Sequence, residues 1–204
     1  MDAFTELDAI ASPVMRQNID TDIVIPIHRL RDVAQAELGP YAFEPLRYLP
    51  DGSDNPEFPL NKPAYKGAEI LVADNNFACG SSREGAVWAL AGMGVKAVIA
   101  SSYGDIFYSN CFQNGILPVA LPLQEVEALA DEMRASPGNA RITVDLENST
   151  VVSPTGRVIP FQIDARRQHA LLNGLDDIAQ TMTHKDAIAA WQKSDQSARP
   201  WTWL

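Results

Sequence analysis

Residues 68–100, AEILVADNNFACGSSREGAVWALAGMGVKAVIA, contain the pattern that decides the fold. Runs of strand length that are apolar except for Glu69 and Lys96 occupy residues 68–73 and 95–100. Between them, the helical spacing of the apolar residues predicts a helix over 83–93, and Gly94 is suited to its C-terminal cap. A strand, a helix and a strand in this order predict a right-handed crossover between two parallel strands.

The chain on either side of this stretch extends the same layered pattern. Residues 141–163 alternate between apolar and polar side chains, with turn signals at 147–148 and 154–156, which predicts short antiparallel strands. The other elements expected after residue 100 are a helix over 103–113 closed by Gly115, a strand over 116–121, an amphipathic helix over 123–135, and helices over 166–173 and 184–191.

Two segments before residue 68 have turn character. NIDTDIVIPI, residues 18–27, predicts a polar turn and then a short buried strand that stops at Pro26. Residues 39–67 contain six prolines, which predicts a long ordered loop with short pieces of regular structure. Parallel and antiparallel strands with packed helices together predict one mixed α/β domain of layered type over 1–204, with a C-terminal tail at about 195–204.

The composition restricts the classes of partner. A formal net charge of -10 opposes binding to the phosphate backbone of DNA or RNA, although a local arginine can still attract a small anionic substrate. No apolar run approaches the roughly 20 residues that cross a bilayer, and no signal sequence is evident at the N-terminus. We therefore expect a soluble protein of the reducing cytoplasm.

A metal site within this chain is not expected. Only two cysteines occur, Cys79 and Cys111, which is too few for the usual four thiolates of an iron–sulfur or structural zinc site. The three histidines lie far apart in the sequence, at His28, His169 and His184.

The polar group of residues 79–84, CGSSRE, lies between a predicted strand and a predicted helix, where open α/β sheets place their ligands. Ser81 and Glu84 match the capping-box pattern, so one interpretation is a simple helix cap. The alternative is an anion site, in which the helix start, Gly80 and Arg83 surround a substrate carboxylate. A thiol enzyme based on Cys79 is a further alternative, whereas the Gly-x-Ser-x-Gly motif of serine hydrolases is absent around Ser81.

Four segments together carry a family resemblance: NIDTDIVIP, NNFACGSSREGAVWAL, SSYGDIFYSNCFQNGILPV and NGLDDIAQTMTHKDAIAAW. Over nearly the whole chain, they resemble the small subunit of 3-isopropylmalate dehydratase, the two-chain relative of aconitase. The resemblance implies the swivelling β/β/α domain of aconitases. It also implies a large subunit with a four-iron four-sulfur cluster, and the interconversion of 2-isopropylmalate and 3-isopropylmalate through isopropylmaleate in leucine biosynthesis.

The same resemblance assigns roles to individual residues. Ser81 would be the catalytic base, acting as an alkoxide, Ser82 would hydrogen-bond the substrate or that alkoxide, and Arg83 would bind a substrate carboxylate. The residues expected to support the site are Asp20, Thr21 and Asp22 of the Asp-Thr-Asp turn, together with Gly80, Asp105 and Asn110. Each of these also has a purely structural interpretation, as part of a capped turn or a braced loop.

This chain departs from the family pattern at two places. Gly85 and Val87 stand where typical members have His and Pro, and IHRLRDV at residues 27–33 replaces the usual continuation after Pro26. His28, Arg29 and Arg31 are therefore candidates for contacts with the variable part of the substrate. The alternatives are a paralogue that dehydrates another substituted malate, of dimethylmalate or citramalate type, and a non-catalytic partner subunit.

The C-terminal RPWTWL places Trp201 and Trp203 on a short tail after Pro200. Exposed aromatic residues of this kind often mark a contact surface. The large subunit, a second copy of this chain and the chain's own core are the candidate partners of this tail.

Overall fold

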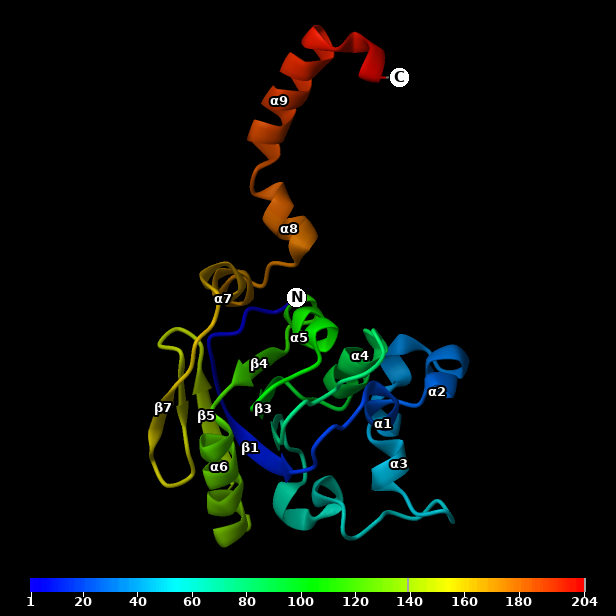
Figure 1. The fold of residues 1–204 in the computed structure, drawn as a ribbon, viewed down its shortest axis with the longest axis vertical. Coiled ribbons are helices and arrows are strands. Elements are labelled where there is room, and N and C mark those ends of the chain that lie inside the picture. Colours follow the sequence, from blue (N-terminus) through cyan, green and yellow to red (C-terminus); the bar gives the residue numbers. More distant parts are fainter. Residues whose placement is uncertain (139, 204) are drawn as a thin grey trace.

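A single mixed sheet organises the protein. The computed structural model describes residues 1–138 and 140–203, and within them the strand order is β4-β3-β2-β1-β5-β6-β7 (Figure 1). The strands are β1 (Glu6–Val14), β2 (Ile70–Ala73), β3 (Ala97–Ala100), β4 (Leu117–Ala120), β5 (Arg141–Asp145), β6 (Thr150–Val152) and β7 (Val158–Pro160).

Helices cover this sheet and continue beyond it. The α-helices are α1 (Thr21–Val24), α2 (Ile27–Asp32), α3 (Glu44–Arg47), α4 (Gly85–Gly92), α5 (Asp105–Gln113), α6 (Leu123–Ala135), α7 (Ala165–Leu172), α8 (Asp177–Met182) and α9 (Lys185–Ala198). The short 3-10 helices are η1 (Gln35–Glu37), η2 (Gly39–Tyr41), η3 (Pro59–Asn61), η4 (Pro63–Tyr65) and η5 (Pro200–Thr202).

β1 joins the two halves of the sheet. Its C-terminal part runs parallel to β2, from Ala11 opposite Ile70, and its N-terminal part runs antiparallel to β5, from Glu6 opposite Asp145. The remaining pairs are parallel in β2-β3-β4 and antiparallel in β5-β6-β7. The predicted mixture of parallel and antiparallel strands is confirmed, but β1 itself lies outside the elements that the sequence predicts.

The two faces of the sheet carry separate hydrophobic cores. Ile70 and Val72 of β2 belong to one core, which α6 covers, whereas Leu71 and Ala73 belong to the other core, which α4 covers. All four strand residues are fully buried. The alternation confirms that the parallel strands are buried on both faces, as expected for a layered α/β domain. Burial of each large apolar side chain stabilises the fold by roughly 1.5–3 kcal/mol. The two cores therefore fix the edge of the sheet from which the site loops extend.

Three details of the predicted local structure differ from the observed fold. Residues 21–24 form the helix α1 instead of a strand, because the Asp20 side chain accepts a hydrogen bond from the backbone N–H of Ile23 at 2.8 Å and caps the helix. No helix is predicted over residues 177–182, where α8 lies, and α9 extends beyond its predicted end at residue 191. The long loop over 39–67 contains only α3 and short 3-10 helices, as predicted.

The last elements leave the body of the molecule. We call residues 177–203, which comprise α8, α9 and η5, the C-terminal arm; it projects past α7 and the N-terminus (Figure 1). The predicted tail lies at the far end of this arm, except for residue 204, which is outside the described residues. In the part of the chain that the structure describes, no helix is long and apolar enough to span a bilayer.

Candidate functional site

Three loops meet at the carboxyl ends of the parallel strands. They follow β1, β2 and β3, and backbone hydrogen bonds join them directly. These bonds run from Asn18 N to Asn75 O, from Thr21 N to Cys79 O and from Phe77 N to Ser102 O, each at 3.0 Å. The loop with the polar group of residues 79–84 is therefore held between its two neighbours.

Ser81 lies on the exposed side of this junction. Gly80 before it has φ +85°, a conformation that favours glycine, and the Thr21 hydroxyl donates a hydrogen bond to the Ser81 carbonyl oxygen at 3.2 Å. The capping-box interpretation is wrong. α4 begins at Gly85, its N-cap residue is Glu84, and no side chain caps it. Ser81 thus does not serve as the helix cap.

Arg83 links the Asp-Thr-Asp turn to Ser81. Its guanidinium forms a bidentate ion pair with the Asp22 carboxylate, with Nη2 at 2.7 Å from Oδ2, and the same Nη2 donates to Ser81 Oγ at 2.9 Å. The hydrogen bond from Arg83 lowers the pKa of Asp22, against the effect of partial burial. Asp22 and Arg83 therefore both stay charged at neutral pH, beside the serine oxygen.

This arrangement suits an anion. A guanidinium at 2.9 Å stabilises negative charge on Ser81 Oγ, which a serine needs when no neighbouring base is present. Among the described residues, no histidine hydrogen-bonds Ser81, and the backbone N–H groups of Gly80, Ser81 and Ser82 have no protein acceptor. Ser82 is exposed beside them, so the surface offers donors to a ligand.

The candidates in α2 have different surroundings. Arg29 forms a bidentate ion pair with Glu44, at 2.5 and 2.8 Å, and its guanidinium lies 4.1 Å from the centre of the Tyr41 ring. Arg31 pairs with its neighbour Asp32 on the surface. His28 is exposed and makes no hydrogen bond in the described structure. The structure thus gives Arg29 a partner within the protein, and it describes no contact from these three residues to Ser81 or Arg83.

The absence of a side chain at Gly85 allows α2 to pack against the start of α4. A Cβ atom at residue 85 would lie 2.4 Å from Leu30 Cδ2, so the Leu30 side chain fills the space next to the glycine. Val87 of α4, which also departs from the family pattern, is fully buried in the core on that face of the sheet. Gly85 stands out in the sequence but Leu30 does not, because its role depends on a contact between segments 55 residues apart.

Asp105 starts α5 beside the same junction. Gly104 before it approaches the loop after β2 so closely that a Cβ atom there would lie 2.5 Å from the Ala78 carbonyl oxygen. The Asp105 side chain is exposed and has no hydrogen bond in the described structure. Asn110 contributes its backbone carbonyl oxygen, which accepts from the Asn114 side chain at 2.9 Å. The structure therefore places Asp105 at the start of α5 and gives its side chain no partner among the described residues.

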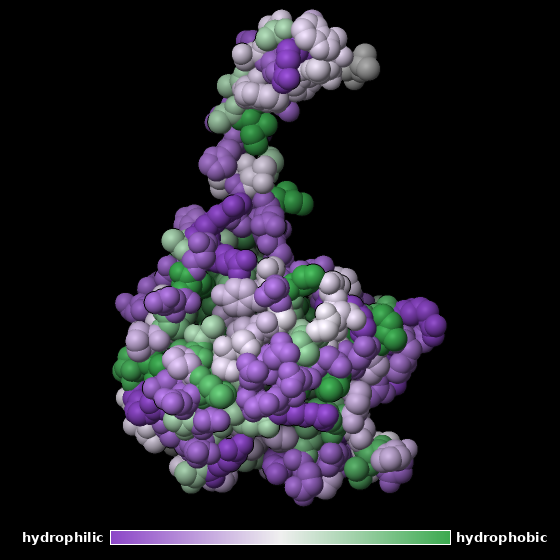
Figure 2. Space-filling view, in the orientation of Figure 1, coloured by the Kyte–Doolittle hydropathy of each residue, from purple (hydrophilic) through white to green (hydrophobic). Residues whose placement is uncertain are grey.

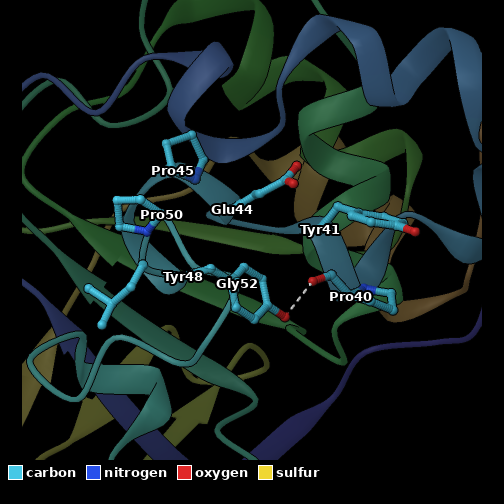
Figure 3. A pocket seen from close by; sticks show the side chains of 8 residues that line it. Pro40, Tyr41, Glu44, Pro45, Tyr48, Pro50 and Gly52 are labelled. Carbon is cyan, nitrogen blue, oxygen red and sulfur yellow. Dashed lines mark hydrogen bonds between the residues drawn. The ribbon is translucent and has the colours of Figure 1, made fainter.

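A hollow of about 670 Å³ lies elsewhere, between η2 and α3 (Figure 3). Its lining residues are Pro40, Tyr41, Glu44, Pro45, Tyr48, Leu49, Pro50 and Gly52. Its one carboxylate, that of Glu44, already binds Arg29, and the Tyr48 hydroxyl donates to the Pro40 carbonyl oxygen at 3.1 Å. The hollow therefore has aromatic and proline walls but no free charge, and Ser81 and Arg83 are not part of it.

The two cysteines do not form a reactive pair. Cys111 is fully buried, and burial raises the pKa of its thiol well above the usual range. Cys79 is half-buried, and its backbone, through the bond to Thr21, holds the loop. Within the described residues, no group of three or more His, Cys, Asp or Glu side chains is arranged to hold a metal ion.

Comparison with known proteins decides the family. A family model of the aconitase C-terminal domain matches residues 1–124, a LeuD_N model matches 127–165, and a model of the C-terminal domain of the 3-isopropylmalate dehydratase small subunit matches 177–202. The small subunit of 3-isopropylmalate dehydratase from Dinoroseobacter shibae is 50% identical over 201 residues, which cover 98% of this chain and 100% of the relative. The chain belongs to the 3-isopropylmalate dehydratase small-subunit family.

Other members of this family agree with the assignment. The small subunit from Agrobacterium fabrum is 50% identical over 202 residues, covering 98% of this chain and 100% of the relative. The crystal structure of 3-isopropylmalate dehydratase from Methanocaldococcus jannaschii superposes with a TM-score of 0.66 at 25% identity, covering 91% of this chain and 98% of that one. The family resemblance and the aconitase-type fold are both confirmed.

Proposed function

We propose that this chain is the small subunit of a hydro-lyase that interconverts 2-isopropylmalate and 3-isopropylmalate through isopropylmaleate, in the leucine pathway of the cytoplasm. The observation that carries the proposal is the contact of Arg83 Nη2 with Ser81 Oγ at 2.9 Å on an exposed surface that also offers free backbone N–H groups. Membership of the small-subunit family supports it independently.

In the proposed reaction, Ser81 acts as the base. Its alkoxide removes a proton from a substrate carbon that carries a carboxylate, while the hydroxyl group leaves the neighbouring carbon and isopropylmaleate forms. When water then adds to isopropylmaleate with the opposite placement of hydrogen and hydroxyl, the Ser81 hydroxyl returns the proton. Arg83 lowers the cost of the alkoxide because its guanidinium already donates to the serine oxygen. Ser82, which is exposed next to Ser81, would hydrogen-bond the substrate or the alkoxide.

Arg83 has the second role of binding a substrate carboxylate. Asp22 occupies two of its N–H groups from one side, so the guanidinium is held in a fixed direction before substrate arrives. Asp20 and Thr21 fix Asp22 in turn, because Asp20 caps α1 and Thr21 bonds to the loop after β2. Gly80 precedes Ser81 in the same loop and Asp105 begins α5 after the neighbouring loop, and both would support this geometry.

The reaction also needs groups that we place on a large subunit. A four-iron four-sulfur cluster there would supply a Lewis acid for the leaving hydroxyl group. The exposure of Ser81 and Ser82 supports this division, because a substrate bound there needs a second wall to exclude water. His28 and Arg31 of α2 are candidates for contacts with the variable group of the substrate, and Arg29 would hold α2 in place through Glu44.

The test is turnover by the assembled enzyme. The chain would be co-expressed with the 3-isopropylmalate dehydratase large subunit of its own genome and purified anaerobically. The ultraviolet absorbance of the unsaturated acid would then be followed from 2-isopropylmalate and from dimethylmalate and citramalate. Turnover of 2-isopropylmalate that Ser81→Ala abolishes supports the proposal. Turnover of dimethylmalate or citramalate but not of 2-isopropylmalate would assign that compound as the substrate. Full activity of the Ser81→Ala variant would show that this chain is a non-catalytic subunit.

A further inference from the structure

The C-terminal arm has the properties of a segment that folds on a partner. None of the residues of α8, α9 and η5 that the structure describes is buried, and α9 is only 14 residues long. Isolated helices of this length are marginal in water, since most helix stability in proteins comes from packing of an apolar face. Among the described residues, no hydrogen bond or ion pair joins residues 184–203 to residues 1–176. α8 is tied to the body, because Arg166 Nε donates to Gln180 Oε1 and the Asp177 backbone N–H donates to Gln113 Oε1, each at 3.2 Å. In the described structure, α9 and η5 have no such ties, so this outer part of the arm is open to a partner.

Hydrophobic side chains are concentrated on the arm. Figure 2 shows it standing clear of the body with hydrophobic groups exposed. Six of the twelve large hydrophobic residues that are exposed in the described structure belong to it, although it is about an eighth of the chain. These six are Ile178, Met182, Ile188, Trp191, Trp201 and Trp203. Such a concentration marks an interaction surface.

Hydrogen bonds to the Asp195 side chain fix the aromatic residues at the end of the arm. Asp195 accepts from Arg199 Nε at 2.7 Å and from the indole N–H of Trp203 at 2.9 Å. η5 is thereby folded back on α9, and the rings of Trp203 and Trp191 lie with their centres 6.5 Å apart. Trp201 stays 71% exposed. Aromatic residues held in a fixed arrangement are the usual anchors of protein interfaces.

The charge distribution argues against a second copy as the partner. The arm carries three acidic and three basic residues, so the formal charge of -10 belongs to the rest of the chain. Two copies docked through their arms would bring two strongly negative bodies together, which electrostatic repulsion opposes. A neutral apolar surface of a different chain does not have this cost.

The family models indicate which chain this is. The aconitase C-terminal domain model ends at residue 124, whereas the model that matches the arm, over 177–202, is described as the C-terminal domain of the 3-isopropylmalate dehydratase small subunit. A segment that lies outside the aconitase domain match and carries the small-subunit description suits the task of binding the other subunit. We propose that Trp191, Trp201 and Trp203 of the arm dock into an apolar groove of the large subunit; this inference rests on the proposed function for the identity of the partner.

The test measures binding of the full-length chain to the isolated large subunit by titration calorimetry. The variant is Trp191→Ser with Trp201→Ser, and the control is Val158→Ser, which removes an equally exposed hydrophobic residue from β7. We expect the dissociation constant to rise on the order of 30-fold or more in the double variant and to stay within about twofold in the control. Turnover at saturating double variant should equal that of the wild type, because the arm is not part of the Ser81 site.

Other outcomes would overturn the docking proposal. These are a double variant that binds the large subunit like the wild type, a wild-type chain that does not bind it, and a sedimentation experiment in which the double variant loses only self-association. Because binding is measured without substrate, arm-dependent binding with no turnover of 2-isopropylmalate would reject the proposed substrate and leave the docking surface supported. Far-ultraviolet circular dichroism and the midpoint of thermal unfolding would show that the double variant has a folded body.

Discussion

Asp22 of α1 and Arg83, 61 residues apart in the sequence, form a bidentate ion pair that ties α1 to the loop after β2. The Arg83 side chain is only 18% exposed, whereas that of Asp22 is 53% exposed, so the carboxylate covers the guanidinium from outside. The pair directs Arg83 toward Ser81 Oγ. In the proposed reaction, Asp22 is therefore a positioning residue.

Replacement of Asp22 by Asn should weaken catalysis without removing a reacting group. The amide keeps one oxygen acceptor but loses the charge, so Arg83 is held less firmly, and we expect kcat/KM for 2-isopropylmalate to fall roughly 10- to 100-fold. The control is Asp8→Asn, because Asp8 pairs with Arg141 at 3.2 Å and is 52% exposed. Similar kinetics in the two variants would mean that Asp22 is an ordinary surface ion pair.

Ser81→Ala tests the proposed base itself. Since a positioned acid or base contributes typically 10²–10⁴-fold to a rate, we expect kcat to fall by about that factor while the large subunit still binds. Ser109→Ala, an exposed serine of α5 without a side-chain hydrogen bond in the described structure, is the matched control. A pH profile of the residual activity would separate loss of the base from a change in substrate affinity.

Cys79→Ala distinguishes the serine mechanism from a thiol mechanism. The contacts described for Cys79 at the loop junction involve its backbone N–H and carbonyl oxygen, which alanine retains. Turnover should therefore remain within about threefold of the wild type, in line with ordinary small effects of conservative changes outside a reaction centre. Loss of activity, with the thermal midpoint unchanged, would instead favour a catalytic thiol.

The sequence predicts the parallel half of the fold well because its signals are local. The apolar runs of β2 and β3 and the helical spacing of α4 lie within residues 68–100, and α6 has the bounds predicted for it. β1 is different, since its burial changes from alternating in the half that pairs with β5 to continuous in the half that pairs with β2. A strand with two kinds of partner has no single periodic pattern.

The sequence predicts which residues form the candidate site, but not how their side chains are arranged. Ser81, Arg83 and the Asp-Thr-Asp turn stand out in the sequence, yet the ion pair of Asp22 with Arg83 requires the tertiary contact of two loops. The prediction for α1 is wrong for a related reason. The apolar residues of IVIP suggest a strand, but the hydrogen bond from the Ile23 backbone N–H to the Asp20 side chain stabilises a helix. Short segments follow such local caps and tertiary contacts more than their intrinsic propensity.

The contact between Gly85 and Leu30 predicts an energetic coupling. Gly85→Ala places a methyl group 2.4 Å from Leu30 Cδ2 and forces the end of the leucine side chain to move, which costs on the order of 1 kcal/mol of stability. Leu30→Ala removes the obstructing atoms. We therefore expect the double variant to be more stable than the sum of the two single changes predicts, by roughly 1 kcal/mol, in urea unfolding. Strict additivity would show that the two residues are not in contact.

Glu132 links α6 to the turn between β6 and β7. Its carboxylate accepts from Thr155 Oγ1 and from Arg157 Nε, each at 2.7 Å. Burial alone would raise the pKa of Glu132, but the hydrogen bonds from Thr155 and Arg157, with the Ser153 hydroxyl beside them, outweigh it and lower the pKa to about 2. The charged form is thus bound more favourably in the folded protein than in the unfolded chain.

The sign of the pH dependence follows from this lowered pKa. The stabilisation by Glu132 is complete above its unfolded value of about 4.5 and is lost as the pH falls toward about 2. Glu132→Gln should therefore lower the free energy of unfolding by about 1–3 kcal/mol at pH 7 and by much less near pH 2.5. Glu127→Gln, at an exposed residue of the same helix, should change stability little at either pH. Urea unfolding at the two pH values makes the comparison, and an equal loss at both would contradict the assigned role of the charge.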